Sequence, residues 1–234
     1  TLGQEKTRIS KDGKEKKVPG DSRKTIANKR AILGRFCQWL KDQGELMENP
    51  VRQTRGPKIA RTDPVHLTRM ELGRALWMAK RQKLWSVFFA AYTGVRLSEM
   101  RRVTWGDIRQ GPNGKIIVIR EAKANQPRSL PVSRRLASVL ARMKPGAPDE
   151  LLFPEHGPRW WNRQLRAIRK AVPKIDRDGG GWHDFRRTVG SLLVQKGYSI
   201  YTVAKVLGHS DIKTTARYYA HLDAEAGRDA LDSL

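Results

Sequence analysis

The chain has 234 residues, with 47 Lys and Arg against 23 Asp and Glu, and a formal net charge of +24. Its 38% hydrophobic residues are enough for a core, so this charge predicts a folded protein with a polyanionic partner. No segment approaches the roughly 20 apolar residues of a membrane span. The single cysteine, Cys37, excludes an intrachain disulfide and indicates a reducing, cytoplasmic location.

Nucleic acid is the first candidate for the partner. When many Lys and Arg side chains bind its closely spaced phosphates, counterions are released, and this release increases the affinity. An anionic membrane surface is the second candidate. The N-terminal run from Gln4 to Lys17 is polar and has no apolar signal core.

A first module is predicted over residues 1–62. Residues 1–20 are polar and rich in Lys, and from Thr25 to Leu46 apolar residues recur at helical spacing. Asn49-Pro50 ends this helix, and residues 50–64 form a basic linker suited to phosphate. The net charge is +9 over residues 1–62 and +15 over the remainder. Because both parts are basic, we expect two modules that act on one polyanion.

The second module, residues 63–234, is predicted to be mostly helical. Thr68 and Glu71 form a capping box, an apolar helix ends at Gly94, and Ser98 is the expected cap of a short helix. The β-branched residues around a turn cluster at 124–127 predict a β-hairpin. Further helices are expected over residues 133–143, 159–172, 184–196, 200–207 and 212–221. The fold class is therefore mainly α with a small antiparallel β-sheet.

Four side chains near the C-terminus suit phosphodiester chemistry. His183 and Arg186 are three residues apart and so share one helix face, whereas His209 follows a helix-ending Gly208. Tyr218 lies two helical turns further on. A guanidinium can bind two phosphate oxygens at once, imidazole N–H groups can donate to others, and a phenol can act as the nucleophile. No convincing acidic cluster suggests a metal site, and no cofactor is expected.

These residues stand in motifs that resemble those of the tyrosine recombinases, also called the phage integrase family. "HDFRR", "LGHSDIKTT" and the tyrosine that follows resemble its C-terminal motifs. "YTGVRLSEMRRVTW" resembles its first arginine motif, and "EAKANQPRSLPV" resembles its hairpin with a catalytic lysine. The order and approximate separations agree over residues 68–222. The resemblance implies that family's catalytic core at 63–234 with a C-terminal tail, after an incomplete helical core-binding domain and basic linker at 1–62.

The resemblance also implies how the phosphate is held. Arg96 and Arg186 would clamp the scissile phosphate, because two fixed guanidiniums can offset the charge that grows on a pentacoordinate phosphorus. His209 would donate a hydrogen bond to the same phosphate. Glu99, three residues after Arg96, would support the site from behind.

The proton transfers and the nucleophile follow from the same resemblance. Lys123 would protonate the departing 5′ oxygen, although Lys115 also lies in the hairpin, and His183 would accept the tyrosine proton. Tyr218 stands at the family's spacing of nine residues after the motif histidine, and it would attack to give a 3′-phosphotyrosine. Tyr219 is the alternative, because the family often has His two residues after the nucleophile and His221 follows Tyr219 at that spacing.

The sequence therefore predicts a metal-independent, site-specific DNA recombinase or integrase of a phage or other mobile element. Its predicted partners are double-stranded recombination sites, three further copies of itself in a tetramer on a Holliday junction, and accessory DNA-bending proteins. It would act at the nucleoid of a bacterial or phage-infected cell. The alternatives are a type IB topoisomerase, a DNA-binding protein without cleavage, and a metal-dependent nuclease.

Overall fold

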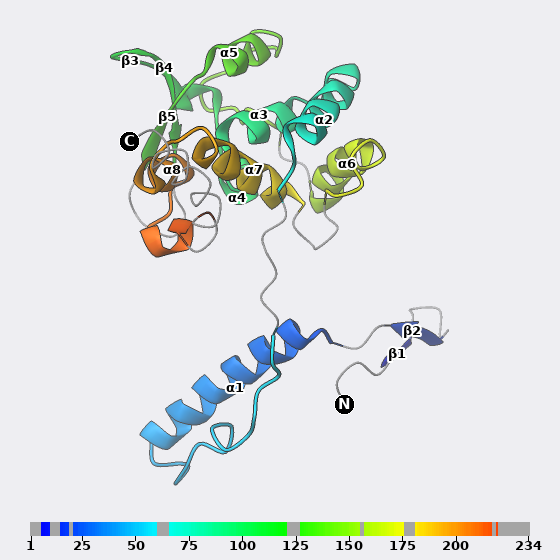
Figure 1. Ribbon diagram of the computed structural model, residues 1–234, viewed down its shortest axis with the longest axis vertical. Coiled ribbons are helices and arrows are strands. Elements are labelled where there is room, and N and C mark those ends of the chain that lie inside the picture. Colours follow the sequence, from blue (N-terminus) through cyan, green and yellow to red (C-terminus); the bar gives the residue numbers. More distant parts are fainter. Residues whose placement is uncertain are drawn as a thin grey trace, which may run out of the picture. The chain divides into compact units, whose positions relative to one another are not determined.

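A computed structural model describes most of the chain and divides it into two compact units, residues 1–62 and 63–234 (Figure 1). The described residues are 6–9, 15–18, 21–59, 66–120, 127–154, 157–175, 181–216 and 219. In this part of the chain, no helix is long and apolar enough to cross a lipid bilayer.

The first unit contains one long helix and a short hairpin. Strands β1 (Lys6–Ile9) and β2 (Glu15–Val18) pair antiparallel, in a region whose polar composition gave no strand prediction. Helix α1 (Arg23–Asp42) confirms the predicted helix and begins at Ser22, whose hydroxyl accepts a hydrogen bond from the backbone of Thr25.

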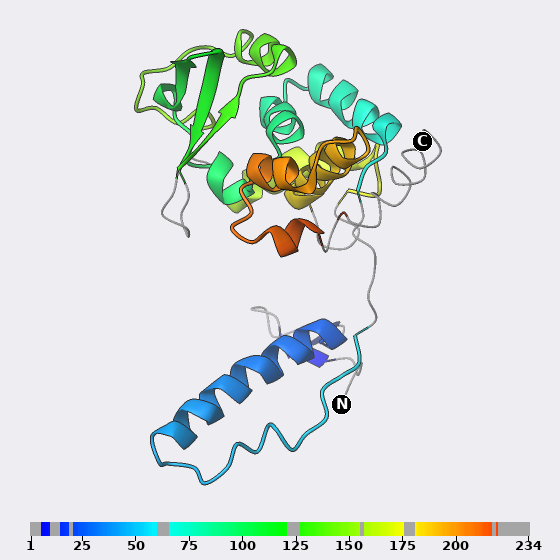
Figure 2. The same cartoon turned by 60° about the vertical axis from the view of Figure 1, so that its left-hand side comes forward.

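The segment after α1 returns along the helix, as Figure 2 shows. The side chain of Asn49 donates to the carbonyl of Gly34 at 2.8 Å, and Arg30 donates to the carbonyl of Val51 at 2.7 Å. These bonds secure the residues that follow the break predicted at Asn49-Pro50.

The core of the second unit is built around α3 (Trp85–Thr93). Seven of the nine residues of α3 are buried, and it contacts α2 (Arg69–Arg81), α5 (Arg134–Leu140), α6 (Pro158–Arg169) and α7 (Trp182–Val194). Figure 1 shows these helices gathered around α3. A helix that is apolar on all sides becomes the centre of the domain because every face of it must be covered.

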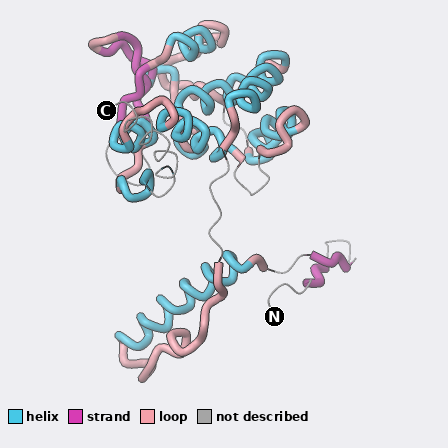
Figure 3. The backbone as a smooth tube through the Cα atoms, in the orientation of Figure 1, coloured by secondary structure: helices cyan, strands magenta, loops and turns pink. Residues whose placement is uncertain are grey.

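Three antiparallel strands form the predicted small sheet, in the order β3-β4-β5 (Figure 3). The strands are β3 (Ile108–Gly111), β4 (Gly114–Ile119) and β5 (Arg128–Pro131). Ile117 of β4 lies opposite Leu130 of β5, and both are buried. The β4–β5 pair confirms the predicted hairpin, whereas β3, which follows the 3-10 turn η1 (Trp105–Asp107), was not predicted.

Helix ends largely match the capping signals in the sequence. The Thr68–Glu71 capping box is present, and α8 (Ile200–Leu207) lies between Ser199 and a left-handed Gly208. The prediction that Ser98 caps the next helix was wrong. Helix α4 (Leu97–Met100) begins two residues earlier, with Arg96 as its cap, because the Glu99 carboxylate accepts a hydrogen bond from the Arg96 backbone N–H.

Gly94, which ends α3, has φ of +65° and lies where a side chain has no room. A Cβ there would be 2.9 Å from Leu207 Cδ2 and 3.2 Å from Val189 Cβ. We therefore expect Gly94→Ala to lower the free energy of unfolding, measured by urea denaturation, by about 1–3 kcal/mol.

The matched control for this change is Gly73→Ala. Gly73 lies inside α2 with nothing near its Cβ position, so alanine should raise the free energy of unfolding by about 0.5–1 kcal/mol. A Gly94→Ala protein as stable as the unmodified chain would contradict the packing described for Gly94.

Candidate active site

Arg96 is held from two sides. Its Nη1 donates to Glu99 Oε1 at 2.7 Å, and its Nη2 donates to the carbonyl oxygen of Gly208 at 3.1 Å. Gly208 ends α8 in the left-handed conformation, and its carbonyl is at the negative end of that helix. These contacts fix the guanidinium, while the Arg96 side chain remains about one-third exposed and lines a pocket.

Glu99 is buried and pairs with a second arginine that the sequence reasoning did not assign. Arg128, at the start of β5, donates from Nη1 to Oε1 at 3.1 Å and from Nη2 to Oε2 at 2.9 Å. Burial by itself raises the pKa of Glu99, but the hydrogen bonds from Arg128 and Arg96 outweigh it and lower the pKa to about 2. Glu99 is therefore an anion that joins the hairpin to the loop carrying Arg96.

Arg186, on α7, is anchored in the same manner as Arg96. Its Nη1 donates to the carbonyl oxygen of Gly94 at 2.9 Å. Its buried Nη2 has no acceptor among the described residues. Burial and the charge of Arg96 lower the pKa of Arg186 to about 10, so it remains a cation at neutral pH. An anion in the adjacent pocket would supply the missing acceptor.

That pocket has a volume of about 200 Å³, and side chains from three parts of the chain line it. The lining residues are Arg96, His183, Arg186, Arg187, His209, Thr214 and Tyr219. Four of the predicted site residues therefore converge, together with the runner-up tyrosine. Among the described residues, no group of three His, Cys, Asp or Glu side chains could hold a metal ion.

Both histidines are neutral at physiological pH. Burial of the ring, and then the charges of Arg186, Arg187 and Arg96, lower the pKa of His183. Burial and the charges of Arg186 and Arg96 lower the pKa of His209 to about 4. A neutral imidazole can accept a proton from a phenol, as the role predicted for His183 requires.

Tyr219 lies over Gly190, which is one turn along α7 from Arg186. Any side chain at position 190 would overlap the phenol ring and its hydroxyl, so glycine provides the space for them. Tyr219 is buried against Val194, Val203 and Leu207. The phenol therefore belongs to the packed wall of the pocket.

Two predicted residues, Lys123 and Tyr218, lie outside the described residues. Their assigned roles stay predictions. The sequence reasoning also missed Arg128, Arg187, Thr214 and Gly190. For Arg128 a signal was present, since it stands in the hairpin motif, but only the folded chain brings it to Glu99.

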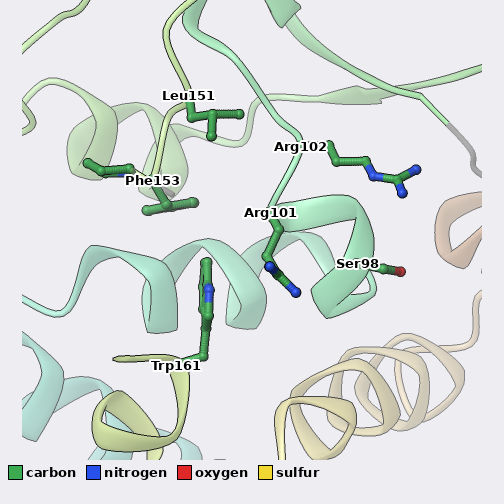
Figure 4. A pocket seen from close by; sticks show the side chains of 7 residues that line it. Ser98, Arg101, Arg102, Leu151, Phe153 and Trp161 are labelled. Atoms are coloured by element: carbon green, nitrogen blue, oxygen red, sulfur yellow. The ribbon is translucent and has the colours of Figure 1, made fainter. Parts of the chain in front are cut away.

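A larger hollow, of about 450 Å³, lies next to α4 (Figure 4). Arg101, Arg102 and Ser98 line it together with the apolar side chains of Leu151, Phe153 and Trp161. It contains neither a histidine nor a tyrosine. Of these two pockets, the smaller one brings nucleophile and base candidates together, so it is the candidate active site.

Known proteins resemble this chain over most of its length. The profile of the phage integrase family matches residues 72–226. The chain is 28% identical to a tyrosine recombinase XerC of Chromohalobacter salexigens, with 89% of this chain and 73% of that protein covered. It is 26% identical to the integrase of Escherichia phage P2, with 86% and 56% covered. The chain belongs to the phage integrase family, the tyrosine recombinases, as its motifs predicted.

Solved structures confirm the predicted fold. The Tn1549 transposon integrase in complex with a circular intermediate DNA aligns with a TM-score of 0.68 at 20% identity, and the alignment covers 92% of this chain and 81% of that chain. A lambda integrase dimer bound to a core site aligns with a TM-score of 0.61 at 17% identity, covering 82% and 74%.

The Glu99 anion gives a pH-dependent prediction. The unfolded chain protonates this carboxyl near its ordinary pKa of 4.5, whereas the folded chain does so only near 2. The stabilisation is therefore present above pH 4.5 and is lost as the pH falls towards 2. It amounts to on the order of 3 kcal/mol.

Glu99→Gln provides the comparison, because the other titrating groups are common to both proteins. Urea denaturation between pH 3 and 6 should show the unmodified chain more stable at pH 6, with a difference that shrinks as the pH falls. A difference that is constant over this range would show that the Glu99 charge does not stabilise the fold.

Proposed function

We propose that this chain is the catalytic part of a site-specific DNA recombinase that cleaves and rejoins strands through a 3′-phosphotyrosyl intermediate. One observation carries the proposal: three guanidiniums, two neutral imidazoles and a phenol line one pocket of about 200 Å³. Arg186 there has a buried N–H without an acceptor among the described residues. A phosphodiester oxygen meets that need, because guanidiniums bind phosphate oxygens through charge-assisted hydrogen bonds.

The proposed reaction keeps the bond energy within the protein–DNA adduct. The phenol gives its proton to His183 and attacks phosphorus while the bond from phosphorus to the 5′ oxygen breaks. Lys123 protonates that oxygen, and the DNA 3′ end is left as a phosphotyrosine. Attack by a 5′ hydroxyl from another strand reverses the step, so strands exchange without ATP. Arg96 and Arg186 stabilise the extra negative charge on the phosphorane.

The surroundings of Tyr219 support it as the nucleophile. Tyr219 lines the pocket with both arginines, and Gly190 leaves room for its hydroxyl one helical turn from Arg186. Spacing from the His209 motif favours Tyr218, which lies outside the described residues. We give more weight to the shared pocket, since attack requires the phenol oxygen to reach the phosphorus.

The exposed face of α6 suits the DNA backbone. Trp161, Leu165 and Ile168 face the core, whereas Arg159, Arg163 and Arg166 line a surface hollow with Trp160 and Asn162. We propose that these arginines contact phosphates beside the cleavage site. Related structures include a lambda integrase tetramer bound to a Holliday junction, which supports four protomers acting on two sites here as well.

A nicked suicide substrate separates the two tyrosines. The unmodified chain should become covalently attached to the DNA 3′ end, and Tyr218→Phe should do so too, whereas Tyr219→Phe should give only background attachment. Denaturing gel electrophoresis measures the adduct when the cleaved strand carries its label at the 5′ end, because that fragment stays attached to the protein.

The opposite pattern would identify Tyr218 as the nucleophile and overturn the Tyr219 assignment. Absence of any adduct from the unmodified chain, with DNA binding retained, would overturn the proposed reaction in favour of a DNA-binding protein without cleavage. Relaxation of supercoiled plasmid over many turnovers, without preference for a site, would favour a topoisomerase.

Salt dependence tests the α6 surface. Each phosphate contact contributes about 0.7–0.9 to the slope of log K against log salt concentration, so Arg163→Gln with Arg166→Gln should lower the slope by up to about 2. Fluorescence anisotropy with duplex DNA at several salt concentrations measures the slope.

Arg142→Gln is the control, because it removes one charge from an exposed residue that follows α5. Its slope should match that of the unmodified chain. Equal slopes for the α6 variant and the unmodified chain would place the DNA elsewhere.

A further inference from the structure

His209 and Thr215 form a short hydrogen bond at the edge of the pocket. His209 Nδ1 and Thr215 Oγ1 are 2.6 Å apart, and Thr215 is fully buried. His209 follows the left-handed Gly208, and its backbone N–H donates to the carbonyl of Ala204 at 3.0 Å. Thr215 lies on the helical turn that follows α8, where the Asp211 carboxylate accepts a hydrogen bond from the backbone N–H of Lys213.

The direction of this bond follows from the burial of Thr215. Among the described residues its hydroxyl makes no other hydrogen bond. If His209 donated from Nδ1, the hydroxyl hydrogen would be left without an acceptor in a dry site, at a cost of roughly 1–3 kcal/mol. A hydroxyl can both donate and accept. The arrangement that satisfies every group has Thr215 donating and Nδ1 accepting.

This direction decides which nitrogen of His209 carries the proton. Burial and the nearby arginines lower the pKa of His209 to about 4, so the ring has one N–H at neutral pH. When Nδ1 accepts, that proton must be on Nε2. The pocket-lining His209 then offers an N–H donor to a ligand and adds no further charge beside Arg96 and Arg186.

We infer that Thr215 is a positioning residue that holds His209 in the Nε2–H tautomer, so that the ring can donate to a non-bridging oxygen of the scissile phosphate. The inference deepens the proposed function and rests on it for the identity of the phosphate. The bond itself involves no proton transfer during the reaction.

Thr215 also links this donor to the tyrosine segment. Thr215 and Tyr219 are four residues apart, a separation that places side chains on the same face of a helix. Both are buried. The residue that orients the phosphate-binding imidazole is therefore a close neighbour in the sequence of the residue whose phenol would attack.

The first measurement reads the tautomer directly and needs no DNA. Long-range ¹H–¹⁵N spectra of the uniformly ¹⁵N-labelled chain distinguish protonated from unprotonated ring nitrogens, and the His209 signals are those that disappear in His209→Asn. The unmodified chain should show Nε2 protonated and Nδ1 as a hydrogen-bonded acceptor. Thr215→Ser should keep this pattern, and the isosteric Thr215→Val should lose the Nδ1 hydrogen-bond shift.

The second measurement is the single-turnover cleavage rate on the suicide substrate. Loss of one oriented donor costs up to about 100-fold to 1,000-fold in rate, so Thr215→Val, which weakens the orientation without removing the ring, should cleave at least about tenfold more slowly. DNA affinity should be unchanged, and Thr215→Ser should restore most of the rate.

Three results would overturn the inference: Nδ1 protonated in the unmodified chain, unchanged His209 shifts in Thr215→Val, or equal cleavage by Thr215→Val and the unmodified chain. Failure of the unmodified chain to cleave would instead contradict the proposed reaction, and the spectra would still decide how His209 is protonated.

Discussion

The site depends on one kind of contact, made twice: a guanidinium bound to the carbonyl oxygen of a glycine that ends a helix. Arg186 binds the carbonyl of Gly94, and Arg96 binds that of Gly208. Both glycines adopt the left-handed conformation that other residues enter at a cost. A helix C-terminus also carries partial negative charge, which favours a nearby cation. The two helix ends therefore fix the arginines without neutralising them.

Several cations around a small pocket repel one another, and a nearby negative charge is needed to compensate for this repulsion. Glu99 provides that compensation from behind, since one buried carboxylate binds both Arg96 and Arg128. The remaining positive charge faces the pocket, where burial and then this charge lower the pKa of both histidines. The charge distribution that would bind a phosphate thus also favours neutral imidazoles, which can accept a proton or donate a hydrogen bond.

The position of Tyr219 depends on residues that lie far from it in the sequence. Tyr219 fits only because residue 190 of α7 is glycine, and its ring packs on residues of α7 and α8. Thr215 and His209 join the turn before it to the end of α8. Movement of this segment would therefore displace the His209 ring and the Tyr219 phenol together.

The sequence by itself determined the family, the mainly helical fold and most of the helix ends. Those features depend on short-range signals: the Thr68–Glu71 capping box, the glycines after α3 and α8, and motifs of a few residues. It also identified Arg96, Glu99, His183, Arg186 and His209 as candidates, though their spacing alone could not show that they meet.

Only the tertiary structure decided what depends on residues far apart in the chain. It paired Arg128 with Glu99 across 29 positions and brought Gly208 to Arg96 across 112. It also placed Tyr219 in the pocket, although spacing had favoured Tyr218. Local propensity and spacing describe neighbours along the chain, whereas burial and hydrogen-bond satisfaction are set by segments that meet only after folding.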